Sequence, residues 1–322
     1  MKQIMRVAVT LTAGLAAVLA GVAPAHTIEP LELRPAALER GADIRLPHLE
    51  GRTVVDGDVR VRVRGERVTL LGRSGKGYVV GVTRADGSGG VVKRVRPGAP
   101  ARVLLRRVSP YVLTLSGDGQ HLARVSGNTP ERTRITVYRA SNGTVLRGRT
   151  FAGSASVLDV EEGRMVIGSW GPNRTLWWDF ASNTTAKVVA RTGSAADIAG
   201  NRLATYTGDP YEGGCVIVSR LDTPRVAGWR SCSERVAAFS PDGGRMATIH
   251  ILSDGLGPDE VRVRTASGQV VGRYTAHWFG ALVFENERAL LLDTNGEKWA
   301  ATVRCVAARC VRASALRPVP TF

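Results

Sequence analysis

The residues of this sequence that most directly suggest chemistry are four cysteines, Cys215, Cys232, Cys305 and Cys310. No histidine lies within ten residues of any of them to complete a metal site. The C-x4-C spacing of the last two also differs from the C-x2-C spacing of redox motifs. An even number of cysteines in an exported chain indicates disulfides. We therefore predict two structural disulfides and no metal site.

Other catalytic motifs are missing. Residues 72–77 (GRSGKG) are similar to a phosphate-binding loop but lack its G-x4-G-K-[ST] spacing, and no G-x-S-x-G or H-E-x-x-H motif occurs. The histidines after residue 25 are scattered, at His26, His48, His121, His250 and His277. We therefore predict no catalytic residue and no cofactor.

A short pattern recurs along the chain and indicates how such residues are positioned. It is a turn with Gly or Asn, often followed by Arg, and then a hydrophobic run, as in residues 163–166 (GRMV) and 243–247 (GGRMA). Its hydrophobic positions are separated by 44, 43, 38, 43 and 43 residues and are Tyr78, Leu122, Met165, Leu203, Met246 and Ala289. A period of about 40 to 50 residues indicates propeller blades.

Each copy lies between two β-rich runs, and two further runs follow it, so each unit predicts four strands. This places complete blades near residues 68–110, 111–153, 154–192, 193–233, 234–276 and 277–316. Residues 53–56 and 58–63 predict an extra hairpin, with a third strand at residues 44–46. We predict an all-β protein, a single β-propeller of four-stranded antiparallel blades. Seven blades with an incomplete first one are favoured over six blades plus an N-terminal hairpin.

The chain ends suggest further boundaries. Residues 1–25 have the layout of a signal peptide, because Lys2 and Arg6 precede an uncharged run that ends in small residues. An uncleaved membrane anchor is the alternative, since that run approaches the length that spans a bilayer. We expect an extended leader at 26–43, the propeller domain at 44–316 and a C-terminal tail at 317–322, with no transmembrane segment after signal removal.

One turn supports a family resemblance. Residues 240–247 (SPDGGRMA) resemble the S-P-D-G-x-x-hydrophobic-A turn of TolB-like and WD40-like bacterial propellers, and residues 116–123 are a degraded copy. The mature chain resembles secreted TolB-like propellers of actinobacteria. It departs from them because one blade alone keeps the full motif and because the large N-terminal domain of TolB has no room here. The resemblance implies an architecture and no catalytic residue.

The blade pattern also selects a cysteine pairing. Cys215 and Cys232 fall opposite each other across the two outer strands of one unit, and Cys305 and Cys310 flank a four-residue hairpin loop. Opposed strand residues have Cα atoms about 4.5 to 5.5 Å apart, which a disulfide can span. We predict the pairs Cys215–Cys232 and Cys305–Cys310.

Charge points to a class of partner. The chain carries a formal net charge of +16, and residues 52–107 hold 14 Lys and Arg against four acids. The favoured interpretation is that alternating arginines form the solvent-exposed face of a strand. The alternative is that this region attracts an anionic polymer.

The loops that join second to third strands predict the functional surface. They are residues 126–131, 170–174, 207–213 and 253–259, and they place Trp170, Asp209, Tyr211, Asp254 and Asp259 on one face. We expect a secreted, non-enzymatic, monomeric module that binds a protein or an anionic envelope polymer and no specific nucleic acid. The alternative is a propeller enzyme, a hydrolase, lactonase or oxidoreductase, with its site at the channel mouth.

Overall fold

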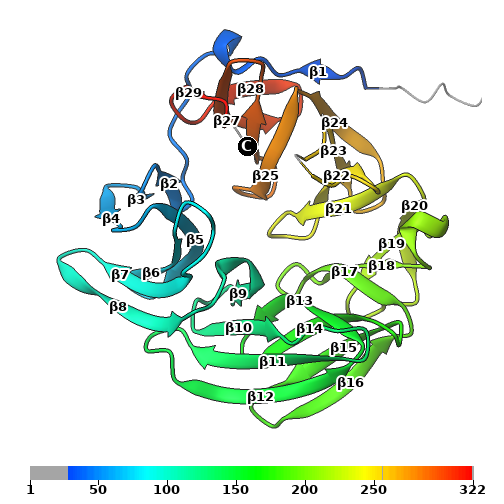
Figure 1. Cartoon of the computed structure of the whole chain (residues 1–322). Helices are drawn as coiled ribbons and strands as arrows, with labels where there is room; N and C mark the ends of the chain where they lie inside the picture. The colour runs from blue at the N-terminus through cyan, green and yellow to red at the C-terminus, as the bar shows by residue number, and fades with distance from the viewer. Residues whose placement is uncertain (1–27, 256, 321–322) are drawn as a thin grey trace, which may run out of the picture.

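The chain folds into a ring of seven small antiparallel sheets around a central channel, as the computed structural model in Figure 1 shows. The structure describes residues 28–255 and 257–320, so the expected signal peptide at 1–25 lies outside it. The all-β propeller and its seven blades, the first one incomplete, are confirmed. Within the described residues, no helix has the length and apolar character needed to cross a bilayer.

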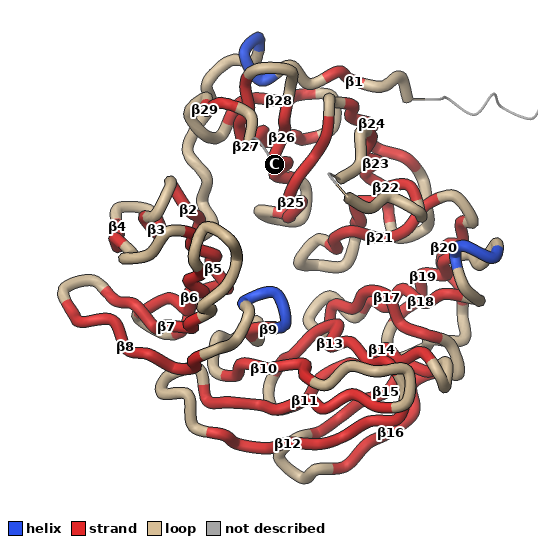
Figure 2. The backbone as a smooth tube through the Cα atoms, in the orientation of Figure 1, coloured by secondary structure: helices blue, strands red, loops and turns tan. Residues whose placement is uncertain are grey.

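Six blades have four antiparallel strands that follow one another outwards from the channel (Figure 2). The strands of blades two to four are β5 (Arg67–Ser74), β6 (Gly77–Thr83), β7 (Val91–Arg96), β8 (Ala99–Arg106), β9 (Leu113–Leu115), β10 (His121–Ser126), β11 (Arg132–Arg139), β12 (Val145–Ala152), β13 (Ser154–Glu161), β14 (Arg164–Trp170), β15 (Arg174–Asp179) and β16 (Thr184–Val189).

Blades five to seven repeat this plan, with short additions from both ends of the chain. Their strands are β17 (Thr192–Asp197), β18 (Arg202–Tyr206), β19 (Val216–Arg220), β20 (Ala227–Ser231), β21 (Glu234–Phe239), β22 (Arg245–His250), β23 (Glu260–Thr265), β24 (Val270–Thr275), β25 (Trp278–Phe284), β26 (Leu290–Asn295), β27 (Trp299–Val306) and β28 (Arg309–Arg312). The additions are β1 (Leu31–Glu32), which pairs with β24, and β29 (Arg317–Pro318), which pairs with β27. Three short 3-10 helices are η1 (Pro35–Ala37), η2 (Pro110–Val112) and η3 (Pro210–Glu212).

Blade one has three strands, β2 (His48–Glu50), β3 (Thr53–Asp56) and β4 (Val59–Arg62). The hairpin lies where the sequence predicts it. The prediction of a third strand at residues 44–46 is wrong, because the third strand of this blade is β2, at His48–Glu50. Pro47 explains the shift: proline has no N–H to donate, so the strand begins after it. Ile44 and Leu46 instead pack against Leu291 and Ala313 of blade seven.

The recurrent hydrophobic positions owe their regularity to burial on both faces of a blade. They lie in or beside the second strand, which is covered by its own sheet neighbours and by the blades on either side. All six are at most 8 % exposed, namely Tyr78, Leu122, Met165, Leu203, Met246 and Ala289. A polar side chain at such a position would lose its hydrogen bonds to water without gaining a hydrogen-bond partner in the protein.

The two copies of the Ser-x-Asp-Gly turn form the same hydrogen bonds. Ser240 Oγ donates to Asp242 Oδ1 over 2.6 Å and accepts from the Arg245 N–H over 2.8 Å. In the degraded copy, Ser116 Oγ likewise donates to Asp118 Oδ1 and accepts from the His121 N–H. The motif is thus a self-contained clamp on the turn between first and second strands, which explains its recurrence without a catalytic role.

Residues 28–43, expected as an extended leader, form a strap across the outer strands of blades six and seven (Figure 1). Leu31 pairs in parallel with Tyr274, and the Leu33 N–H donates to Thr275 O over 2.8 Å. Farther on, the Gly41 N–H donates to Arg312 O over 2.9 Å. The strap then leads directly into blade one.

A buried ion pair fixes the end of the strap. Arg304 and Glu285 of blade seven pair over 2.7 Å with side chains 13 % and 2 % exposed. Arg304 also donates to the carbonyls of Ala42 and Asp43, while Glu285 Oε1 accepts the Arg45 N–H over 2.8 Å. First and last blades are therefore tied by the strap, and their sheets share no strand.

Leu33 tests the contribution of the strap. Its side chain is 1 % exposed and packs among Tyr274, Phe279 and their neighbours. We expect Leu33→Ala to lower the free energy of unfolding by about 2 to 5 kcal/mol, measured by urea denaturation. The control Leu31→Ala, at a 37 % exposed position of the same strap, should cost less than about 1 kcal/mol. Equal losses in both variants would contradict a specific role for the buried leucine.

Candidate binding face

All connections from second to third strand emerge on one side of the ring, because strand direction alternates in the same way in every blade. The connections between successive blades emerge on that side too. We call this side the loop face. Trp170 ends β14, Asp209 and Tyr211 lie between β18 and β19, and Asp254 and Asp259 lie between β22 and β23.

Two aromatic rings stack on the loop face, and sequence reasoning missed one of them, Tyr206. The rings of Trp170 and Tyr206 stack with centroids 5.9 Å apart and planes inclined by 24°. Burial raises the pKa of Tyr206, while the nearby charge of Arg235 acts to lower it and Tyr211 acts to raise it. Tyr211 lies on the same face, in the connection that follows Tyr206. We call Trp170, Tyr206 and Tyr211 the aromatic cluster.

Tyr211 is presented to solvent by a rigid turn. It is 73 % exposed in the middle of η3. Asp209 caps this 3-10 helix, since its Oδ1 accepts the Tyr211 N–H over 2.9 Å. Gly213 ends it at φ +84°, a left-handed conformation that suits glycine. The exposed Asp209 carboxylate thus holds the backbone of Tyr211 in place.

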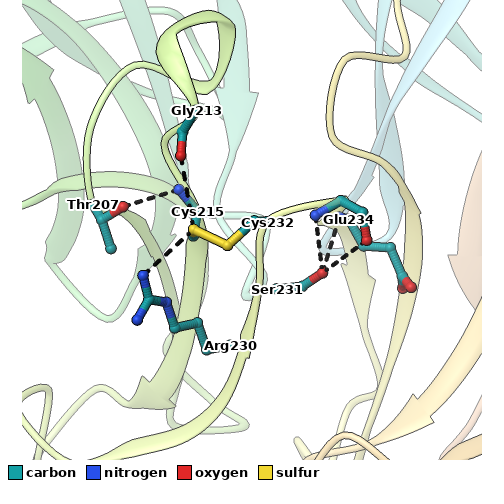
Figure 3. Close-up of a disulfide and its surroundings, with 8 residues drawn as sticks. Thr207, Gly213, Cys215, Arg230, Ser231, Cys232 and Glu234 are labelled. Atoms are coloured by element: carbon teal, nitrogen blue, oxygen red, sulfur yellow. Dashed lines mark hydrogen bonds between the residues drawn. A yellow bond between two sulfur atoms is a disulfide. The ribbon is translucent and has the colours of Figure 1, made fainter.

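The Cys215–Cys232 disulfide closes the base of this loop (Figure 3). Cys215 precedes β19 and Cys232 follows β20, so the bond links the open end of an outer hairpin. The Cys215 N–H donates to Thr207 Oγ1 over 2.9 Å, and Arg230 Nη2 approaches the Cys215 sulfur at 3.5 Å. The second disulfide, Cys305–Cys310, joins directly paired residues of β27 and β28. Both pairs are those expected from the sequence.

The two remaining predicted residues lie apart from the aromatic cluster, in the connection of blade six. Asp254 and Asp259 are both exposed. Asp259 lines a cavity of about 270 Å³ together with Glu234, His250 and Arg262. The contact that links this connection to the first strand of its blade comes from Arg235, whose Nη2 donates to Ser253 O over 2.9 Å. Arg235 was also missed by sequence reasoning.

A buried ion network lies beneath that cavity. Glu234, whose side chain is 6 % exposed, pairs with Arg262 and Arg264 over 2.5 Å each and accepts from Thr248 Oγ1 over 2.6 Å. Burial acts to raise the pKa of Glu234, but the hydrogen bonds from Arg264 and Thr248 outweigh it and hold the pKa below its ordinary value. The network ties three strands of blade six, and Arg264 also lies over the Trp229 ring of blade five.

A larger cavity of about 660 Å³ lies between the strap and blade seven. It is lined by Arg34, His277, Lys298 and Trp299, the last of which is 45 % exposed. Sequence reasoning missed this cavity, because its walls come from segments far apart in the chain: the strap on one side, and blades six and seven on the other. It adds the exposed side chain of Trp299 to the loop face.

Two carboxylates line the central channel. Asp159 and Asp197 border a cavity of about 450 Å³ with Phe239. Burial raises the pKa of both, and their mutual proximity adds to this for Asp159. Asp159 accepts the N–H groups of Val160 and Ile198, so it links blades four and five. In the described part of the chain, no three His, Cys, Asp or Glu side chains are grouped to hold a metal ion.

Of the two disulfides, Cys215–Cys232 should restrain the loop of residues 207–214, whereas Cys305–Cys310 should not. In the chain-entropy model their separations of 17 and 5 residues make removal of Cys215–Cys232 cost about 3 kcal/mol and removal of Cys305–Cys310 about 2 kcal/mol. We expect Cys215→Ser/Cys232→Ser to speed hydrogen exchange in residues 207–214, measured by mass spectrometry. The matched control Cys305→Ser/Cys310→Ser should leave that segment unchanged. Equal exchange in both variants would contradict a role of the first disulfide in fixing the loop.

Glu234 should make stability depend on pH. Its lowered pKa means that the ionised form stabilises the fold above the unfolded-state pKa of about 4.3, and that this contribution is lost as pH falls through the folded-state pKa. We expect Glu234→Gln to cost about 3 kcal/mol at neutral pH, because Arg264 loses its buried partner. Urea denaturation at a series of pH values should show the difference shrinking on acidification. Exposed Glu212→Gln is the control, and a pH-independent loss would contradict the assignment.

Comparisons with known proteins support the fold alone. No protein-family model and no curated protein match the chain. Among solved structures, it is similar to the β-propeller domain of the Trilobed protease from Pyrococcus furiosus, at 10 % identity over 82 % of this chain and 86 % of that one, with a TM-score of 0.58. The Myceliophteria thermophila Cps50 (Swd1) propeller domain matches at 11 % identity, 80 % and 88 % coverage and a TM-score of 0.53. TolB from Acinetobacter baumannii matches at 15 % identity, 74 % and 63 % coverage and a TM-score of 0.48. The chain is thus similar to propellers of several kinds, protease propellers included.

Proposed function

We propose that the chain is an exported, non-enzymatic β-propeller that binds a protein partner through the aromatic cluster on its loop face. The observation that carries this proposal is Tyr211, a mostly exposed aromatic side chain on a turn that is capped, ended by glycine and closed by a disulfide. Large aromatic side chains that are ordered before binding lose little conformational entropy on association. Trp170 and Tyr206 supply the adjoining apolar surface.

The predicted acids complete this binding face. Asp209 holds Tyr211 in place, and Asp254 and Asp259 add exposed negative charge over blade six. A partner with an apolar centre and basic rim would match the arrangement, since interfaces commonly join an aromatic core to a polar border. We propose a monomer that binds through this face.

Export is supported by two independent features. The sequence opens with Lys2 and Arg6, followed by an uncharged run and Ala23-Pro24-Ala25. The described part of the chain contains two disulfides and no free cysteine. Disulfides form and persist in oxidising compartments. We propose secretion or retention in the cell envelope.

Tyr211→Ala tests the proposal, with Tyr111→Ala as its matched control. Tyr111 is 79 % exposed and occupies a capped Pro-Tyr turn of the same kind, between blades two and three. Partners would be captured on immobilised wild-type protein from an envelope fraction, identified by mass spectrometry and purified for affinity measurement. We expect Tyr211→Ala to weaken binding about 30-fold or more, as for an interface anchor, and Tyr111→Ala to change it less than about threefold.

A partner that binds both variants like the wild type would contradict the aromatic cluster as the binding site. Thermal melting of each variant would show that the ring is intact. Turnover of a hydrolase or lactonase substrate by the purified protein would contradict the non-enzymatic proposal.

A further inference from the structure

Blade one lacks the outer strand that the other six blades possess, which leaves an open edge on β4. In Figure 1, β4 lies on the outer rim of the ring, beside the hairpin of β7 and β8. An open edge presents unpaired backbone N–H and C=O groups to any extended chain. Here the edge borders a groove of about 450 Å³ instead of flat surface.

The ladder pattern shows which backbone groups face the groove side. The Val63 N–H donates to Arg52 O over 2.8 Å, and Val61 is paired with Val54 one step along. Alternation in an antiparallel ladder therefore turns the N–H and C=O of Arg60 and Arg62 away from β3. Within the described residues β4 pairs with no other strand.

The groove joins an apolar floor to a basic border. Val61, Val63 and Val95 are at most 8 % exposed and form part of the core between blades one and two. The charged residues that line the groove are all basic, namely Arg62, Arg64, Lys93 and Arg96. Lys93 reaches across it, because its Nζ donates to the Arg64 carbonyl over 3.2 Å.

Two acids near the groove are paired with arginines that do not line it. Glu50 pairs with Arg60, and Asp56 pairs with Arg73. In the described part of the chain, Arg62, Arg64 and Arg96 take part in none of the ion pairs. Burial lowers the pKa of neighbouring Arg94, and the charges of Arg96 and Arg102 lower it further. The three groove arginines Arg62, Arg64 and Arg96 are therefore not neutralised by an ion pair within the described residues.

We infer that this groove binds an extended acidic segment of a partner protein, which pairs with the open edge of β4 and completes blade one as its fourth strand. Backbone hydrogen bonds to Arg60 and Arg62 would hold the segment, as in other strand additions. Alternate side chains would face the basic border and the apolar floor. The site is separate from the aromatic cluster and independent of it.

The chain's own N-terminal segment fits the groove poorly. The first 27 residues contain Lys2 and Arg6 and no acid, and the described chain begins beside blade six. A polyanion without peptide groups would match the charges, but it would leave the N–H donors of the edge unused. The unpaired backbone groups of β4 and the basic residues around the groove together favour an acidic peptide segment in the extended conformation.

A labelled peptide tests the inference. It would have about eight residues, the length of an ordinary strand, with glutamate alternating with threonine or valine. Fluorescence anisotropy with the full chain should show saturable binding at about 0.15 M salt. The same peptide N-methylated at alternate residues keeps its charge but loses donors, and we expect it to bind about tenfold or more weakly. Hydrogen exchange should slow in residues 59–64 when the unmodified peptide binds.

Charge reversal provides the matched variants. Arg62→Glu/Arg96→Glu changes two exposed groove residues and should weaken peptide binding about tenfold or more. Arg132→Glu/Arg288→Glu alters the net charge equally at exposed positions of blades three and seven and should change binding less than about twofold. Thermal melting of both variants would show that they are folded. The Tyr211→Ala variant should retain full affinity for the peptide, because its substitution lies outside the groove.

Several results would overturn the inference. Polyphosphate that competes fully and binds as tightly as the peptide, together with undiminished binding of the N-methylated form, would identify a polyanion site. Binding that appears only after residues 1–25 are removed would make the chain's own N-terminus the occupant. Concentration-dependent dimerisation that Arg62→Glu/Arg96→Glu abolishes would identify a second copy of this chain as the occupant of the groove. No binding of the peptide would exclude the site.

Discussion

A ring of blades holds its shape only if its first blade is fixed against its last, and here that closure depends on the strap. Leu33 is buried among residues of blades six and seven, and the strap backbone pairs with β24. The Glu285–Arg304 ion pair then holds the backbone just before blade one. Because the first and last sheets share no strand, these contacts replace the ladder that a shared strand would provide.

The blade plan was predictable from sequence because its signal is local and repeated. Met165, Leu203 and Met246 recur at similar spacing since each must be buried on both sides. The Ser240 turn was equally readable, as its hydrogen bonds lie within six residues. The cysteine pairs followed once the outer hairpins were placed.

Sites formed between blades were not predictable. Tyr206 meets Trp170 only because blades four and five stand side by side, and no spacing in the chain encodes that contact. Arg235 reaches Ser253 across its own blade. The start of blade one was misplaced because the alternation of Ile44 and Leu46 with Arg45 is typical of a strand. In the structure Pro47 delays the strand, and Ile44 and Leu46 pack against blade seven. The sequence pattern therefore predicts where the strands lie, but not which side chains of different segments come into contact.

The strap also orders events in time. The strap leaves the ribosome before any of the blades, whereas its partners in β24 and β28 lie in the last two blades to be made. Every blade between them can form while this segment has nothing to pair with. Domains commonly fold from the N-terminal side during synthesis, so ring closure would be the final event here. A chain cut short before blade six could build most of its sheets and would still leave the backbone groups of the strap without their partners in β24 and β28.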